Sequence, residues 1–197
     1  MTMTVIPEAT LRVGRLAKRF FGVTAVRDLS LELHGGAVHG LYGSPGSGKT
    51  TLVRLLTGEI LPDEGSFTLR GRVLTAGGGA LLPGRTVAAN LYLGREPRTG
   101  GVVDRARMAE DAAALLAALG MSGLEPDIRV SALDAAERLL LECACALTWN
   151  VALFVIDDAR EVPDAALRLL ADHGVTVLQL SDDLVGLLEH CDTVTVL

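Results

Sequence analysis

The segment from Gly43 to Thr50, GSPGSGKT, limits the fold of this chain more than any other stretch of its sequence. It matches the pattern G-x-x-x-x-G-K-[S/T] at every position, with the apolar run AVHGLY before it and the amphipathic run KTTLVRLL at its end. Glycines allow the backbone to curl so that successive N–H groups face one anion, and the positive end of a following helix attracts the same anion. The pattern therefore predicts a strand, a phosphate-binding loop and a helix in direct succession.

The two polar residues that end this loop indicate which anion it holds. Lys49 supplies a positive charge for the outer phosphates of a nucleotide, and the hydroxyl of Thr50 suits Mg²⁺. We therefore expect a nucleoside di- or triphosphate with Mg²⁺; the alternative is a glycine-rich surface turn that binds nothing. The predicted nucleotide-binding residues in and beside the loop are Gly43, Ser44, Pro45, Gly46, Ser47, Gly48, Lys49, Thr50 and Thr51.

A second acidic element should complete such a site, and the segment LFVIDD at residues 153–158 provides one. Its continuous apolar run is typical of a buried parallel strand, so the carboxylates follow at the strand end where the phosphate loop also lies. Asp157 is predicted to bind the metal, usually through water, and Asp158 stands where a general base would act. The alternative is an ordinary strand that ends in acidic turn residues.

The order of the periodic segments predicts an α/β fold. After residue 150, apolar runs of strand length alternate with helical segments, which is typical of a parallel sheet covered on both faces. Segments near the N-terminus alternate apolar and polar residues and predict antiparallel strands. We expect one domain over residues 1–197, with a parallel core from residues 37–58 and 150–197, an antiparallel sheet from residues 10–34 and 66–72, and a helical lobe over about residues 86–148.

Composition excludes several other classes of protein. Hydrophobic residues make up 49% of the chain and charged residues 21%, which predicts a globular protein. The net charge of −6, without a long basic run, argues against nucleic acid as a partner. No apolar run approaches the roughly 18 residues of a membrane span, and no leader segment is evident, so we expect a cytosolic protein. The three cysteines and four histidines form no ligand pattern, and we interpret them as structural or surface residues.

Beyond these motifs, the sequence resembles the ATP-binding cassette of ABC transporters, most closely the cassettes of carbohydrate importers. Residues 16–71, which include the Walker A loop, carry most of the likeness, and residues 81–97 and 174–197 extend it. The resemblance implies a P-loop NTPase fold with a RecA-like core, ATP and Mg²⁺ as ligands, and a place on the inner face of the membrane. It also implies a transmembrane permease subunit and a second ABC ATPase subunit as partners. Phe20 takes the place of the aromatic residue that stacks on adenine, and a strand core residue is the alternative.

Several catalytic parts of that family are altered in this chain. The general-base glutamate is replaced by Asp158, which is one methylene shorter, so we expect it to be a weak base. The glutamine that senses Mg²⁺ and the attacking water falls near Gly77, and the switch histidine falls on Asp182. The loop that follows the catalytic glutamate in the family is missing. These departures predict weak or absent hydrolysis with nucleotide binding retained.

The signature motif of the family, Leu-Ser-Gly-Gly-Gln at a helix start, falls on LDAAE, with Asp134 in place of the serine and Glu137 in place of the glutamine. We expect two carboxylates at this position to repel the phosphate of a partner's nucleotide. Ser131 offers an alternative register that needs a gap.

Three functions remain open at this point. The favoured one is the ATP-binding subunit of a carbohydrate importer. A non-catalytic nucleotide-binding regulator or pseudoenzyme outside a transporter is the second, and an unrelated small kinase or GTPase is the third. The third lacks support because no guanine-specific Asn-Lys-x-Asp is present.

Overall fold

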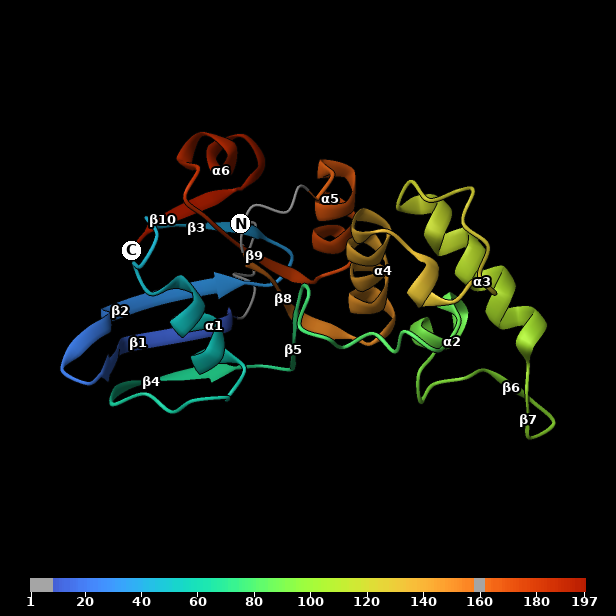
Figure 1. The fold of residues 1–197 in the computed structure, drawn as a ribbon, viewed down its shortest axis with the longest axis horizontal. Helices are drawn as coiled ribbons and strands as arrows, with labels where there is room; N and C mark the ends of the chain where they lie inside the picture. The colour runs from blue at the N-terminus through green and yellow to red at the C-terminus, as the bar shows by residue number, and fades with distance from the viewer. Residues whose placement is uncertain (1–8, 158–161) are drawn as a thin grey trace, which may run out of the picture.

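The computed structural model of the chain describes residues 9–157 and 162–197. A parallel sheet of five strands forms its centre, in the order β10-β3-β9-β8-β5 (Figure 1). These strands are β3 (Val38–Tyr42), β5 (Arg72–Thr75), β8 (Val151–Asp157), β9 (Thr176–Ser181) and β10 (Thr193–Val196). The predicted parallel core is therefore confirmed.

The central strands are apolar throughout because both faces of the sheet are covered. Along β8, Leu153 and Val155 pack with α1 (Lys49–Leu56) and the antiparallel sheet, whereas Phe154 and Ile156 pack with helices on the opposite face. All four side chains are fully buried. Alternate side chains of one strand thus enter two separate hydrophobic cores.

The antiparallel sheet covers the α1 side of the molecule. It contains β1 (Ala9–Phe20), β2 (Val23–His34) and β4 (Glu64–Leu69) in the order β2-β1-β4. The prediction that this sheet extends to residue 72 is wrong, because Arg72 begins β5 and pairs with Val151 in the parallel sheet. Gly71 makes the change of sheet possible: its φ is +102°, and a Cβ there would lie 2.6 Å from the Cβ of Ala152.

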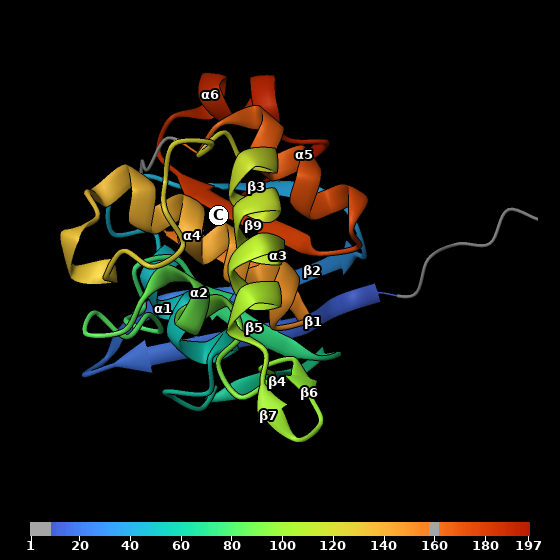
Figure 2. The same cartoon turned by 90° about the vertical axis from the view of Figure 1, so that its right-hand side faces the viewer.

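The helical lobe lies at the far end of the long axis from the antiparallel sheet (Figure 1). It contains α2 (Val87–Leu91), α3 (Arg105–Ala118) and α4 (Ala135–Thr148), with the short hairpin of β6 (Arg98–Thr99) and β7 (Val102–Val103) below α3 in Figure 2. Two further helices, α5 (Asp164–Asp172) and α6 (Leu184–His190), connect the last strands of the core. Parallel core, antiparallel sheet and helices together confirm the predicted α/β fold of a P-loop NTPase.

Across residues 9–157 and 162–197, no helix is both long enough and apolar enough to span a bilayer.

Candidate functional site

The phosphate loop joins the end of β3 to the start of α1. The amide of Gly43 donates to the carbonyl of Ser181 at the end of β9 (3.0 Å), which fixes the start of the loop to the neighbouring strand. The amide of Ser47 donates back to the carbonyl of Ser44 (3.0 Å), which curls the loop. Helix α1 then begins at Lys49. The predicted succession of strand, loop and helix is present.

Gly48 is the position in the loop where a side chain is least tolerable. Its φ is +103°, and a Cβ there would lie 2.0 Å from the carbonyl oxygen of Ala25 in β2. The backbone of the antiparallel sheet therefore approaches the loop so closely that only glycine fits. As the N-cap of α1, Gly48 also brings no side chain to the first amides of the helix.

The start of α1 has the features of an anion site. No side chain caps it, and its first turn holds no acidic residue. The ammonium group of Lys49 donates to the carbonyls of Gly43 and Ser44, so its charge is held over the loop. The hydroxyl of Ser47 is buried and has no hydrogen-bond partner in the described part of the chain. These features fit a nucleotide's phosphates, because amides, an ammonium and a hydroxyl all donate to phosphate oxygens.

A cavity of about 420 Å³ opens at this loop and gathers most of the predicted site residues. Its lining residues are Ala25, Pro45, Gly46, Gly48, Lys49, Thr50, Thr51, Asp157 and Asp182. Gly43, Ser44 and Ser47 belong to the loop but do not line the cavity. Asp158, the predicted general base, lies outside the described residues.

Thr50 and Asp157 reach this cavity from two different elements, the start of α1 and the end of β8. Both offer oxygen atoms, which are the ligands that Mg²⁺ prefers. No cluster of three or more His, Cys, Asp or Glu able to hold a metal exists among the residues that the structure describes. This donor set therefore fits a Mg²⁺ ion that also takes oxygens from nucleotide phosphates and water.

The lining of the cavity includes one residue that the sequence predictions did not name and lacks one that they did. Ala25 of β2 lines it, and no sequence signal pointed to this residue. Phe20, the predicted adenine-stacking residue, does not line it. Phe20 is half-buried at the end of β1, belongs to neither hydrophobic core, and lies under the ammonium of Lys18, 5.5 Å from the ring centroid. This position gives the alternative of a strand core residue no support, and the stacking of Phe20 on adenine stays a prediction.

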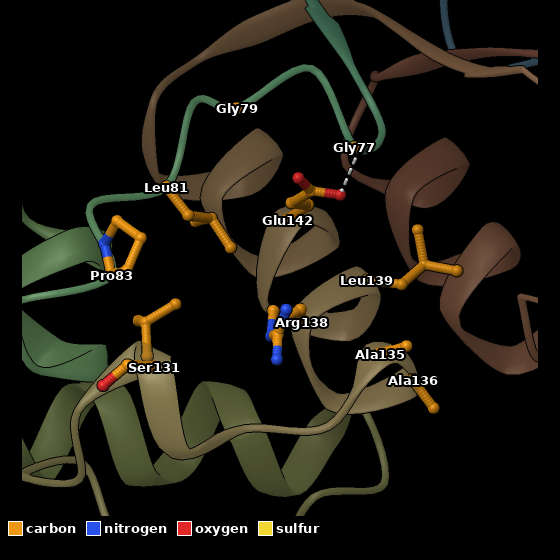
Figure 3. Close-up of a pocket in the computed structure, with 11 residues that line it drawn as sticks. Gly77, Gly79, Leu81, Pro83, Ser131, Ala135, Ala136, Arg138, Leu139 and Glu142 are labelled. Carbon is orange, nitrogen blue, oxygen red and sulfur yellow. Dashed lines mark hydrogen bonds between the residues drawn. The ribbon is translucent and has the colours of Figure 1, made fainter.

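Other residues occupy the positions expected for the sensor glutamine and the switch histidine. Gly77 follows β5 and has no side chain to offer, and its amide instead donates to Oε2 of Glu142 in α4 (2.9 Å; Figure 3). These two residues lie on the wall of a cavity of about 980 Å³ at the junction of the core and the helical lobe. Asp182, at the position expected for the switch histidine, lines the phosphate cavity together with Asp157.

The residues at the expected signature position cap the start of α4. The carboxylate of Asp134 accepts from the amide of Glu137 (2.8 Å), and the carboxylate of Glu137 accepts from the amide of Asp134 (2.9 Å). This reciprocal pair is a capping box, and it places two negative charges at the positive end of the helix. Ser131 lies in the preceding 3₁₀ turn (Val130–Ala132) and not at the start of α4, so the register at Leu133–Glu137 is the one that meets the helix start.

One histidine and two of the cysteines lie in buried or half-buried surroundings that are typical of structural residues. His39 of β3 is buried, and its ring nitrogens lie 2.6 and 3.0 Å from the hydroxyls of Thr193 and Thr195. Burial lowers the pKa of His39 below its ordinary value of 6.5. Burial likewise raises the pKa of Cys143 to about 12 and that of Cys191 to about 11, so neither thiol is a nucleophile at neutral pH.

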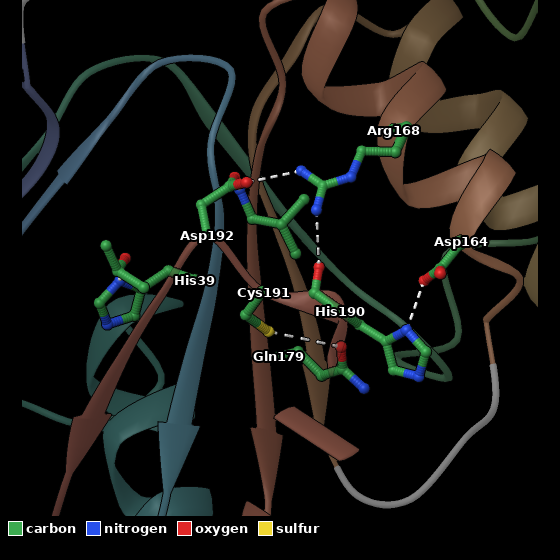
Figure 4. Close-up of polar contacts among 9 residues, drawn as sticks. His39, Asp164, Arg168, Gln179, His190, Cys191 and Asp192 are labelled. Atoms are coloured by element: carbon green, nitrogen blue, oxygen red, sulfur yellow. Dashed lines mark hydrogen bonds and ion pairs between the residues drawn. The ribbon is translucent and has the colours of Figure 1, made fainter. Parts of the chain in front are cut away.

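Near α5 and α6, Figure 4 shows one ion pair and one contact between a histidine and a carboxylate. Arg168 contacts Asp192 (2.6 Å), and His190 contacts Asp164 (2.7 Å). These contacts link α5 to the segment from His190 to Asp192 that precedes β10.

Comparison with known proteins decides the family. The sequence matches the family described as ABC transporter over residues 26–161. The chain belongs to the ABC transporter family. This cassette is 33% identical over 210 residues to "Ribose import ATP-binding protein RbsA 1" of Streptomyces avermitilis, covering 95% of this chain and 40% of that protein. It is 36% identical to the protein of the same name from Rubrobacter xylanophilus, covering 95% and 42%.

Solved ATP-binding cassettes share the fold of this one. The ADP conformation of MJ1267, an ATP-binding cassette of an ABC transporter, superposes with a TM-score of 0.73 at 22% identity, covering 96% of this chain and 87% of that one. The cassette spans about two fifths of the length of the curated relatives it matches.

Proposed function

We propose that this ABC cassette is the ATP-binding part of a carbohydrate importer that binds MgATP and hydrolyses it weakly or not at all. One observation carries the binding half of this proposal. A single cavity joins the uncapped start of α1, the ammonium of Lys49, the hydroxyl of Thr50 and the carboxylate of Asp157. Residues 43–51 would hold the phosphates, and Thr50 and Asp157 would hold Mg²⁺.

Weak turnover follows from the groups that surround this cavity. Hydrolysis requires a water molecule oriented against the γ-phosphate and a base to take its proton. Gly77 has no side chain for that task, and Asp182 adds a negative charge where a hydrogen-bond donor would help. Asp158 is the remaining candidate for the base, and because aspartate is one methylene shorter than glutamate, we expect it to be a weaker base. Mg²⁺, when bound, would neutralise charge on the phosphates.

The partners are also proposed. The names of the relatives describe ribose import ATP-binding proteins. By this likeness we propose that the cassette docks on a transmembrane permease at the inner face of the membrane, beside a second ATPase domain. Because the capping box of Asp134 and Glu137 closes the start of α4, we expect this cassette to contribute little to a nucleotide site on that second domain.

The same capping box favours one other candidate, a nucleotide-binding regulator that works outside a transporter. Purification of the tagged chain from its native membrane separates the two candidates. Recovery of a permease in stoichiometric amount supports the importer, and a chain that remains in the soluble fraction without a membrane partner supports the regulator.

The test of the catalytic half is phosphate release from MgATP by the purified chain, with Lys49→Ala as the control. We expect ATP to bind and phosphate release to be far slower than roughly 1 s⁻¹, the lower end of typical enzyme turnover numbers. Release at or above that rate, abolished by Lys49→Ala, would contradict the proposal of weak turnover. Asp157→Asn should weaken binding of MgATP more than binding of metal-free ATP, because only the former uses the carboxylate.

A further inference from the structure

A second cavity, of about 570 Å³, lies within the helical lobe and has a different chemistry. It opens between α2, the start of α3 and the loops at residues 84–86 and 127–129. We call it the arginine pocket, and its polar lining consists of Arg85, Thr86, Glu96, Arg98, Arg105, Asp127 and Arg129. It shares no residue with the phosphate-loop cavity. In Figure 2, α2 and the β6–β7 hairpin lie near the lower end of α3.

The four arginines of the pocket have unused binding capacity. Within residues 9–157 and 162–197, none of their guanidinium groups makes an ion pair or a side-chain hydrogen bond. Arg107 and Arg95, in the same lobe, are engaged: Arg107 lies 3.5 Å from Asp111, and Arg95 donates to the carbonyls of Thr148 and Trp149. Four positive charges against the two carboxylates leave a formal charge of +2 in a chain whose net charge is −6.

Two of these arginines project from a fixed backbone frame. The amide of Val130 donates to the carbonyl of Arg85 (3.1 Å), and Thr86 forms a β-bridge with Arg129. The amide of Val87 donates to the carbonyl of Ile128 (2.9 Å), and the hydroxyl of Thr86 caps α2. Arg85 and Arg129 therefore start from neighbouring, hydrogen-bonded segments, which lowers the cost of ordering them around a ligand.

The lining indicates the class of ligand. Guanidinium groups bind phosphate oxygens in a bidentate manner, so the four arginines favour a phosphate group. Glu96 and Asp127 would repel a second phosphate but can accept hydrogen bonds from hydroxyl groups. Met108 and Ala88, both buried, give an apolar floor, and the volume suits a small molecule. We propose that the arginine pocket binds a small phosphorylated polyol, such as a sugar phosphate, as a ligand separate from the nucleotide.

The proposal is tested by calorimetric titration of the full chain with ribose 5-phosphate, glucose 6-phosphate and glycerol 3-phosphate. Inorganic phosphate and free ribose serve as partial probes. Four proteins are compared: the wild type, Lys49→Ala, the double variant Arg85→Ala/Arg129→Ala, and the matched control Arg107→Ala. Arg107 is an exposed arginine of α3 outside the pocket. Thermal melting checks the fold of each, and Arg98→Ala/Arg105→Ala replaces the first double variant if that one does not fold.

We expect at least one of the three phosphorylated polyols to bind saturably and more tightly than phosphate or ribose. The arginine double variant should bind the ligand at least about tenfold more weakly, because each substitution removes a charged hydrogen bond to the phosphate. Lys49→Ala and Arg107→Ala should leave it within about twofold.

Three results would overturn the proposal. The first is the absence of saturable binding of all three polyols to the folded wild type. The second is binding that Lys49→Ala abolishes, which would place the ligand at the phosphate loop and leave the proposed function intact. The third is sedimentation with phosphatidylglycerol vesicles that depends on Arg85 and Arg129 while no polyol binds, which would assign the arginines to a lipid surface.

Discussion

Two helices of this cassette begin in opposite ways. At the start of α1, Gly48 brings no side chain, the first turn holds no acid, and Lys49 adds a positive charge. At the start of α4, Asp134 and Glu137 cap each other's amides and place two carboxylates on the helix. A helix N-terminus attracts anions through its free amides and its dipole. The first helix start therefore remains open to phosphate, whereas the second is already satisfied by its own chain.

On the proposed function, this contrast would let the cassette keep nucleotide binding while it contributes little to the site of a second domain. Every residue of the phosphate-binding pattern is present at the start of α1. At the start of α4, both altered residues gain a role in local stability. The two carboxylates that we expect to repel phosphate thus also stabilise the helix that carries them.

The largest expected effect comes from Gly48→Ala, which adds a methyl group at the uncapped start of α1. The left-handed φ and the collision with the carbonyl of Ala25 should lower the free energy of unfolding by at least about 2 kcal/mol and weaken nucleotide binding at least about tenfold. The matched control is Gly58→Ala, which also has a positive φ (+74°) but meets nothing within 4 Å. Chemical denaturation and nucleotide titration of both variants check this, and equal effects would refute the role of close approach.

The next effect in size concerns the closed helix start. Asp134→Ala removes the N-cap of α4 and should lower the free energy of unfolding by about 1 kcal/mol. Asp134→Ser retains an oxygen acceptor and should recover most of that loss. Neither variant should alter nucleotide affinity in the isolated chain. A change in nucleotide affinity of more than about threefold on Asp134→Ala would show that the two helix starts are coupled, against the contrast drawn above.

The smallest expected effect is a dependence of the free energy of unfolding on pH, caused by His39 in the strand before the phosphate loop. Because the folded pKa of His39 is lowered, the unfolded chain takes up this proton first as the pH falls below 6.5. Stability contributed by neutral His39 should therefore be present above that value and be lost as the pH falls toward the folded pKa.

His39→Gln should remove that part of the pH dependence between pH 7.5 and 5, as measured by urea denaturation. His173→Gln, in which the replaced ring is exposed, is the control. An unchanged slope of stability against pH in His39→Gln would show that other groups carry it.

Much of the fold could be predicted from the sequence because periodicity and turn residues act locally. The loop at residues 43–50 and the strand that ends at Asp157 are both encoded within a few positions. The change of sheet at Gly71 was not predictable, because the strand at Arg72–Thr75 is short and gains its place only by pairing with β8.

The phosphate-loop part of the candidate site could also be predicted, because its pattern lies within a few neighbouring residues. The pattern of Lys49 and Thr50 carries its own chemistry, whereas Ala25 enters the phosphate cavity only because β2 passes over Gly48. The capping box shows the limit of the family pattern: the altered residues at 134 and 137 could be recognised as departures, but their reciprocal hydrogen bonds depend on where the helix begins. The arginine pocket likewise arises from segments that meet only in the folded lobe.

The most direct test of the central claim is calorimetric titration of the folded chain with MgADP, which avoids any turnover. Wild type, Lys49→Ala and Asp134→Ala are compared at the same pH and salt. We expect one saturable site per chain, with an affinity that Lys49→Ala weakens at least about tenfold and Asp134→Ala leaves unchanged. No heat of binding to the well-folded wild type, or an affinity that Lys49→Ala leaves unaltered, would contradict it.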